Sequence, residues 1–265
     1  MMAGISGIGN QFHNNQWRVQ NDQQKHMRHA SSGKKIDKAS DGAAEMAIAK
    51  KLANASKGFE VGRENLQAGR SALYIQDGGL AGVTDYMQRM RELTIRANSG
   101  LMSDEDKQYI QDEIDQIKQG STQQAEQTQY NEKDLLTEDG SVTLLTDGSG
   151  ATKDIDTVGA TSEALGTANY TVLNNFDLET VDKAMEKIST ARSISGAQTN
   201  AIDHTMVSNA VSAANLTASQ SVIEDADMAE EMLAVNKNKT LTAAQIMMQK
   251  REEEEAQNRA AGILG

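Results

Sequence analysis

Two histidines in the N-terminal segment have the spacing of a metal site. His26 and His29 lie three residues apart, so on a helix both imidazoles would face the same side. A zinc site needs at least a third ligand, and no nearby pair of carboxylates supplies one. We therefore interpret both histidines as solvated residues on a polar helix, and we predict no metal site and no cofactor.

A second group with chemical potential is the acidic run Glu252–Glu255. Consecutive residues of a helix point in different directions around its axis, so these carboxylates cannot converge on one cation. We interpret the run as a solvated or pore-facing charged surface. The chain also lacks HExxH, a phosphate-binding glycine loop, GxSxG and cysteine, so we predict that it is not an enzyme.

The composition restricts the protein class further. The net charge of −12 argues against nucleic-acid binding, and no apolar run is long enough to span a membrane. The aromatic content is 3% and the mean hydropathy is −0.58, which favours thin helical layers over a thick core. The segment 1–21 lacks the layout of a secretory signal, so we expect any export to use another route. Proline is absent, and nothing therefore interrupts long helices.

A sustained helical pattern runs from about residue 40 to residue 98. Its main row recurs every seven residues, as in a coiled-coil seam: Leu52, Phe59, Leu66, Leu73, Leu80 and Met87. An offset row contains the small residues Ala55, Gly62 and Gly69, which predict the close approach of a partner helix. Gly78 and Gly79 are the weak point of this helix, because glycine is a poor helix former.

Further elements complete the predicted fold. Ser103 is a predicted N-cap for a helix over about 104–128. Another helix is predicted over about 177–222, where Ile188, Ile202 and Leu216 lie in one seven-residue register. Between them lies a small, exposed β insert over about 131–176, with strand-prone runs at 141–145 and 170–173. The fold class is mainly α: long antiparallel coiled-coil-like helices with a small β-hairpin insert.

Four stretches resemble the signatures of bacterial flagellins, in the family's order. Residues 31–49 resemble the N-terminal signature, 88–93 with Ala97 and Asn98 the second, and 110–114 with 127–131 the third helix and hairpin entry. Residues 215–230 resemble the C-terminal signature. The resemblance implies an extracellular filament subunit that forms a helical homopolymer for motility, without the large outer domains of longer flagellins.

The resemblance also implies a division of the chain into layers. Residues 1–36 and 227–265 would be inner-tube helices, and 37–226 a rod-like domain. The implied inner-tube packing residues are Ile5, Ile8, Phe12, Val19, Met232, Leu241 and Met248. The implied rod core is Leu52, Phe59, Leu66, Leu73, Leu80, Met87, Ile188, Ile202 and Leu216. Both ends of this chain are more polar than is usual in flagellins, so an inner tube built from them should be unusually polar.

Partners follow from the same resemblance. It implies export in an unfolded state by the flagellar type III system, with an export chaperone, a filament cap and hook-junction proteins. Arg89, Leu93 and Glu113 match positions that contact the flagellin-sensing Toll-like receptor, and packing between protofilaments is the other interpretation of these residues. The alternatives to a filament subunit are a hook–filament junction protein, an enzyme carried on a flagellin and a free coiled-coil scaffold or adhesin.

Overall fold

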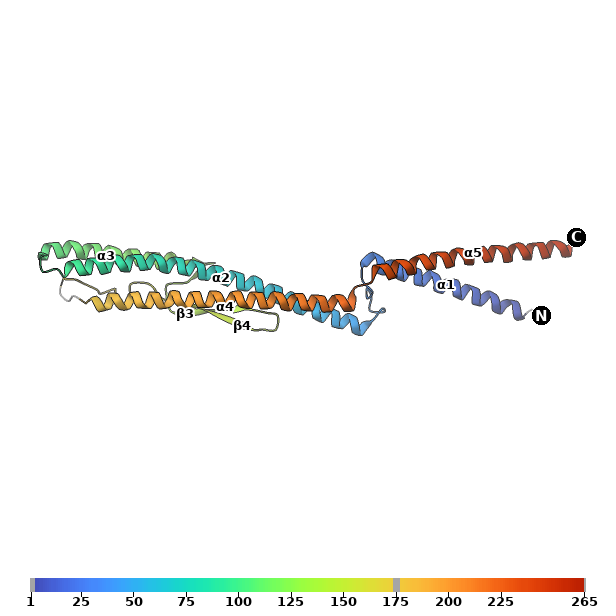
Figure 1. Cartoon of the computed structure of the whole chain (residues 1–265), viewed down its shortest axis with the longest axis horizontal. Coiled ribbons are helices and arrows are strands. Elements are labelled where there is room, and N and C mark those ends of the chain that lie inside the picture. Colours follow the sequence, from blue (N-terminus) through green and yellow to red (C-terminus); the bar gives the residue numbers. More distant parts are fainter. Residues whose placement is uncertain (1–2, 174–176, 265) are drawn as a thin grey trace. The chain divides into compact units, whose positions relative to one another are not determined.

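The computed structural model describes residues 3–173 and 177–264, and side chains over 14–173, 177–255, 257 and 258. In this part of the chain the helices are α1 Ala3–Ser32, α2 Ala43–Ala97, α3 Asp104–Gln127, α4 Leu178–Glu224 and α5 Met228–Leu264 (Figure 1). The strands are β1 Gln129–Tyr130, β2 Lys133–Asp134, β3 Gly140–Leu145 and β4 Thr152–Thr157. The predicted fold class is confirmed, and the three internal helices lie within a few residues of their predicted bounds.

The chain folds as two compact units. The terminal unit combines the described residues of Met1–Ala53 and Leu216–Gly265, and the central unit is Asn54–Asn215. Within the central unit α2 and α4 are antiparallel, because rising residue numbers on α2 meet falling numbers on α4. Three arginine–aspartate pairs join the two helices: Arg70 with Asp203 at 3.0 Å, Arg192 with Asp77 at 2.8 Å, and Arg91 with Asp182 at 2.7 Å.

The seven-residue row of α2 forms the core of the central unit. Leu66, Leu73, Leu80 and Met87 are fully buried, as are Ile188 and Ile202 on α4. Ile110, Ile114 and Ile117 of α3 pack in the same cluster as Leu80 and Met87, whereas Leu66 and Leu73 form a second cluster with Ile155 and Ile202. The ends of the predicted core row are less covered, since Leu52, Phe59 and Leu216 are only half-buried. A helical period of apolar residues thus produces two apolar clusters along one face of α2.

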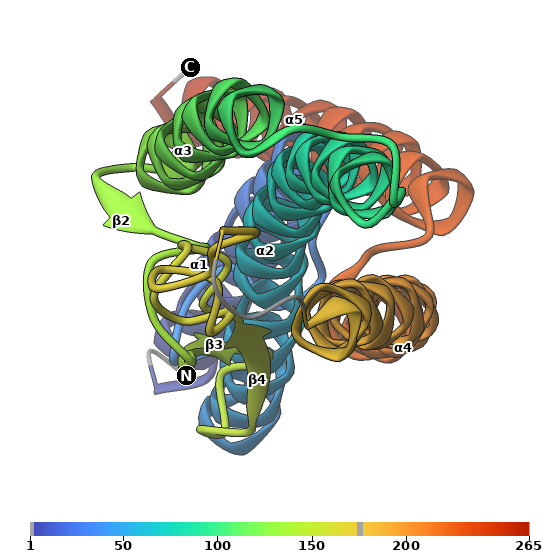
Figure 2. The same ribbon diagram turned by 90° about the vertical axis from the view of Figure 1, so that its left-hand side faces the viewer.

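Gly62 and Gly69 of the offset row pack against the β3–β4 hairpin, so the prediction of a partner helix there was wrong. The hairpin is antiparallel, with Val142 opposite Ile155, and it lies beside α2 (Figure 2). A Cβ atom on Gly62 would lie 1.8 Å from the carbonyl oxygen of Thr146, and one on Gly69 would lie 2.2 Å from Leu144 Cδ1. Only glycine permits this approach of backbone and side chain to the helix.

The insert differs from its prediction in a second respect. The run 170–173 is not a strand, and the second strand of the hairpin is Thr152–Thr157. Tyr170 and Val172 are instead buried in the core, where the Gln111 side chain accepts a 2.8 Å hydrogen bond from the Val172 amide. The Gln111 side chain thus satisfies the backbone N–H of Val172, which would otherwise need a neighbouring strand. Much of the insert, including Leu135 and Leu136, is therefore core and not exposed surface.

The predicted N-cap of α3 is confirmed. The Ser103 hydroxyl accepts a hydrogen bond from the Asp106 amide, and the Asp106 carboxylate accepts one from the Ser103 amide. This capping box satisfies backbone donors that a helix start leaves unpaired. It fixes where α3 begins and thereby places its three isoleucines against α2.

Candidate functional site

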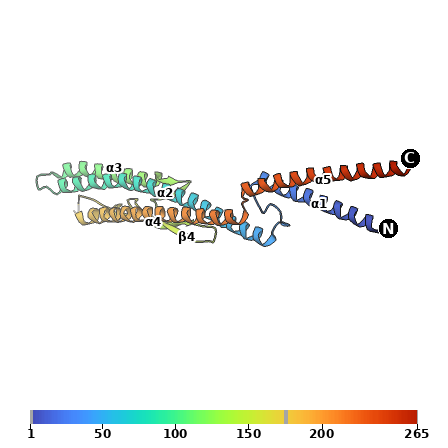
Figure 3. The same cartoon turned by 45° about the vertical axis from the view of Figure 1, so that its right-hand side comes forward.

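The first candidate surface lies on α1 and α5 of the terminal unit. The two helices are antiparallel, and in Figures 1 and 3 they lie close near the connecting segments and diverge toward their N- and C-terminal ends. Val235 of α5 is buried. Apolar side chains nevertheless remain exposed along α5: Met228, Met232, Leu233, Leu241, Ile246, Met247 and Met248. On α1, Val19 is half-buried, and the side chains of Ile5, Ile8 and Phe12 lie outside the described residues. Pairing of α1 with α5 therefore leaves apolar side chains on several faces of α5 uncovered.

Backbone hydrogen bonds connect the segment after α1 to the end of α4 and to the segment before α5. Gly33 has a φ of 71° and terminates α1, donating its amide to the His29 carbonyl. The Lys35 amide then donates to the Glu224 carbonyl at 2.8 Å, and the Ala226 amide to the Gly33 carbonyl at 2.9 Å. Lys34 adds an ion pair of 2.6 Å with Glu224. The segment between α1 and α2 is thereby held against the segment between α4 and α5.

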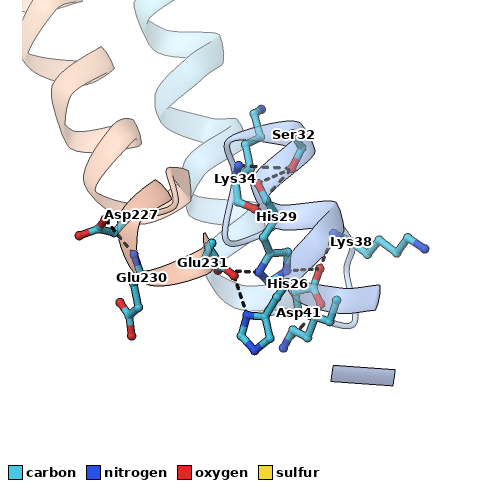
Figure 4. Close-up of polar contacts among 10 residues, drawn as sticks. His26, His29, Ser32, Lys34, Lys38, Asp41, Asp227, Glu230 and Glu231 are labelled. Atoms are coloured by element: carbon cyan, nitrogen blue, oxygen red, sulfur yellow. Dashed lines mark hydrogen bonds and ion pairs between the residues drawn. The ribbon is translucent and has the colours of Figure 1, made fainter. Parts of the chain in front are cut away.

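Beside this crossing, the two histidines of α1 share one carboxylate of α5 (Figure 4). His26 Nδ1 lies 2.6 Å from one oxygen of Glu231, and His29 Nδ1 lies 3.0 Å from the other. The other nitrogen of His29, Nε2, lies 3.8 Å from an oxygen of Asp41. The interpretation of His29 as solvated was wrong, because only 5% of its side chain is exposed. His26 is partly exposed and also has a specific partner.

Both carboxylates of this cluster have lowered pKa values. Burial alone would raise the pKa of Glu231, but the hydrogen bonds from His26 and His29 outweigh it, and the net direction is down. For Asp41 the main cause is the hydrogen bond from the Lys38 amide, with smaller contributions from His29 and Lys25. Two ionised carboxylates therefore enclose His29 in a poorly solvated site.

A second candidate surface lies where α2 meets α3. The Arg89 guanidinium donates two hydrogen bonds to one oxygen of Glu113, at 2.9 and 2.7 Å. This contact raises the pKa of Arg89, and both side chains are about half exposed. Leu93 differs, because it is 1% exposed and belongs to the core. The expected contact surface thus contains Arg89 and Glu113, whereas Leu93 lies inside the subunit.

Sites of other kinds were sought among the described residues. They contain no group of three or more histidine, cysteine or acidic side chains arranged to hold a metal ion. No helix among them is long and apolar enough to cross a membrane. A cavity of about 130 Å³ lies between α2 and the hairpin, lined mostly by apolar residues such as Ala72, Leu135 and Ile155. Its lining provides no convergent set of catalytic groups.

Comparison with known proteins identifies the family. A model of the bacterial flagellin N-terminal helical region matches residues 7–141, and a model of the bacterial flagellin C-terminal helical region matches residues 178–258. The chain belongs to the bacterial flagellin family. As a flagellin it is a structural protein of the extracellular flagellar filament, which agrees with the long helices and uncovered apolar surface described above.

Individual relatives cover nearly the same length. The flagellar filament 33 kDa core protein of Treponema phagedenis is 34% identical over 240 residues, which cover 82% of this chain and 84% of the relative. The flagellin of Bacillus subtilis strain 168 is 30% identical over 275 residues, covering 89% and 90%. Among solved structures, a flagellar hook-associated protein of Vibrio parahaemolyticus aligns with a TM-score of 0.52 over 70% of this chain and 98% of its own. Its sequence identity of 13% shows a similar fold alone.

Proposed function

We propose that this flagellin polymerises into the filament through the terminal unit, with the central unit as the outer rod. The observation that carries the proposal is the set of apolar side chains around α5, among them Met232, Leu241 and Met248, that stay exposed although α1 packs against this helix. Exposed apolar side chains that gather on one element mark protein interfaces, and further copies of the chain would cover these. The central unit, by contrast, encloses apolar cores of its own.

The proposed layers follow the helix ends. Residues 1–36 and 227–265 would line the inner tube, since α1 ends at Ser32 and α5 begins at Met228. Residues 37–226 would form the rod-like layer. The compact units divide the chain further inward, at 53 and 216, because the bases of α2 and α4 group with the terminal helices. Subunit packing in a filament reconstruction would decide between these two boundaries.

The polymerisation proposal is testable by seeded assembly. Purified chain is added to filament fragments and the length gain is measured by electron microscopy. Leu241→Asp places a charge among the exposed apolar side chains of α5 and should stop elongation, whereas the wild type elongates. Asn236→Asp adds the same charge at an exposed polar position of the same helix and serves as the control. Equal elongation by both variants would remove Leu241 from the interface.

We also propose that the chain is exported unfolded through the flagellar type III system, with an export chaperone, a filament cap and hook-junction proteins as partners. Family membership supports this route, and the terminal unit buries few apolar side chains, so it would unfold readily. In a strain without the flagellar export gate, the protein should accumulate inside the cell. Unchanged secretion in that strain would contradict the proposal.

A further proposal concerns the Toll-like receptor that senses flagellin. Arg89 and Glu113 offer an exposed, hydrogen-bonded charge pair, whereas the buried Leu93 would contribute only by holding α2 and α3 together. Arg89→Ala should weaken binding of the monomer to the receptor ectodomain. Arg91→Ala is the matched control, because Arg91 is an equally exposed arginine of α2 paired with Asp182. If Arg89→Ala instead impairs polymerisation alone, the pair belongs to protofilament packing.

The alternative of a hook–filament junction protein is favoured by one observation, the fold shared with a hook-associated protein. That similarity is one of fold alone, and the family matches favour the filament subunit. Immunogold labelling discriminates between them. A filament subunit should be labelled along the whole length, and a junction protein only at the hook end.

A further inference from the structure

We propose that His26, His29, Asp41 and Glu231 form a proton-operated latch that fastens α1 to α5 within the terminal unit. The latch closes when His29 is protonated and loosens when it is neutral. This inference goes beyond a structural role, since it makes the pairing of the terminal helices dependent on pH. It rests on contacts within one chain and therefore does not require the polymerisation proposal to be correct.

The first step of the argument is the sharing of Glu231. Each of its two oxygens is taken by one imidazole of α1, at 2.6 Å from His26 Nδ1 and 3.0 Å from His29 Nδ1. A carboxylate only accepts hydrogen bonds, so both Nδ1 atoms must carry hydrogen. A neutral histidine has one N–H, which leaves its Nε2 as a bare lone pair.

In neutral His29 the lone pair on Nε2 would have no hydrogen-bond donor beside it. Its Nε2 is buried, makes no hydrogen bond within the described structure, and lies 3.8 Å from the Asp41 carboxylate (Figure 4). Two acceptors facing each other repel, and a buried unsatisfied polar atom is costly. Protonation converts Nε2 into a donor directed toward Asp41. The imidazolium then lies between two carboxylates, which compensates its burial.

The surrounding charges support one added proton. The carboxylates come from the 33–42 connection, as Asp41, and from α5, as Glu231. The cation paired with Asp41 besides His29 is Lys25 of α1, at 4.0 Å. With these three groups ionised the cluster carries one net negative charge, and a proton on His29 neutralises it. Arg28 is also next to His29 on α1, while the Lys38 side chain extends away from the cluster in Figure 4.

The range of the latch follows from the groups involved. Histidine ordinarily titrates near pH 6.5, whereas carboxyl groups do so near pH 4. The pKa values of Glu231 and Asp41 are lowered, so both carboxylates stay ionised throughout the ordinary histidine range. Pairing of α1 with α5 should therefore strengthen as the pH falls through the histidine range. It should fail again in stronger acid, when the carboxylates are protonated.

Hydrogen exchange of the full-length chain tests the latch. Exchange is measured in seeded polymers at about pH 6 and about pH 8, corrected for the intrinsic pH dependence of amide exchange. Peptides from the described parts of α1 and α5 are compared with α3 peptides of the same molecules. On raising the pH, protection of α1 and α5 relative to α3 should fall by about fivefold or more. His29→Gln should abolish this dependence, and His204→Gln, at an exposed histidine of α4, should retain it.

The latch would be overturned if the protection of α1 and α5 relative to α3 did not change with pH in the wild type. It would also be overturned if this relative protection still changed with pH in His29→Gln. If His29→Gln does not fold, His26→Gln and Glu231→Gln replace it, with reduced dependence expected for both. If the wild type does not polymerise, the polymerisation proposal fails, and the same exchange measurement on the free chain still tests the latch. Terminal helices unprotected at both pH values would then refute it.

Discussion

The two units of this flagellin are both built from long helices but are held together differently. The central unit buries two apolar clusters along α2, with Leu66, Leu73, Leu80 and Met87 almost completely covered. In the terminal unit the described buried apolar side chains are Ile36, Ala49 and Val235, and the helix contact includes histidine–carboxylate pairs. Apolar burial is less sensitive to pH and salt than a contact between charged groups.

The largest difference between the two units is expected from a pair of leucine-to-alanine substitutions. Leu80→Ala removes a fully buried side chain and should lower the free energy of unfolding by about 3 kcal/mol. Leu233→Ala, at an exposed position of α5, should change the unfolding of the free chain by less than about 0.5 kcal/mol. Urea denaturation followed by circular dichroism measures both. Equal losses would mean that the terminal unit has a core of its own.

A glycine pair tests how closely the hairpin belongs to the central unit. Gly62→Ala would drive a methyl group into the Thr146 carbonyl and should cost about 2 kcal/mol through displacement of the hairpin. Gly78 has open space around it, so Gly78→Ala should stabilise α2 by up to about 1 kcal/mol. Thermal unfolding measures both effects, as a lower midpoint for Gly62→Ala and a higher midpoint for Gly78→Ala. A stabilising Gly62→Ala would show that the hairpin yields without cost.

Tyr170 gives the central unit a pH dependence of the same sign as the latch but at a higher pH. Burial raises the pKa of its phenol, despite the hydrogen bond of 3.0 Å to Thr94. A raised pKa contributes stability that is present below the ordinary value of about 10 and is lost as the pH rises further. Tyr170→Phe should cost about 1 kcal/mol at neutral pH and reduce the loss above pH 10. Denaturation midpoints at both pH values check this, and parallel profiles would contradict it.

The smallest effect is expected at the exposed charge pair of Arg89 and Glu113. Replacing either residue by glutamine should leave the unfolding midpoint unchanged within error, since solvent-exposed pairs contribute little to stability. A double-mutant cycle in urea measures the coupling directly. A clear coupling, persistent in high salt, would show that surface pairs support the central unit as its core does.

The sequence predicted the helices well because their signal is local. A seven-residue recurrence over 52–87 and a serine cap at 103 specify helix position without knowledge of the partner. The hairpin was only half predicted. Its strand 152–157 contains two aspartates and a lysine, which conceal the strand pattern, whereas the β-prone run at 170–173 obtains its backbone partner from the distant Gln111.

The histidine cluster could not be predicted for a different reason. His29 and Glu231 are 202 residues apart, and nothing near either one indicates the other. Their contact follows only from the pairing of the two chain ends. Knowing that α1 packs against α5 would have placed 26 and 29 near the first turn of α5, where Glu231 is the acidic residue that reaches back to them.

The joining of the two ends in one unit has a consequence for synthesis. Ribosomes add about 5–20 residues per second, so α1 waits for about 10–40 seconds before α5 exists. During this time it has no partner, and a strongly apolar helix would associate with other nascent chains. The glutamines, asparagines and histidines of α1 make the waiting segment polar, while the exposed apolar side chains lie on α5, which is synthesised later.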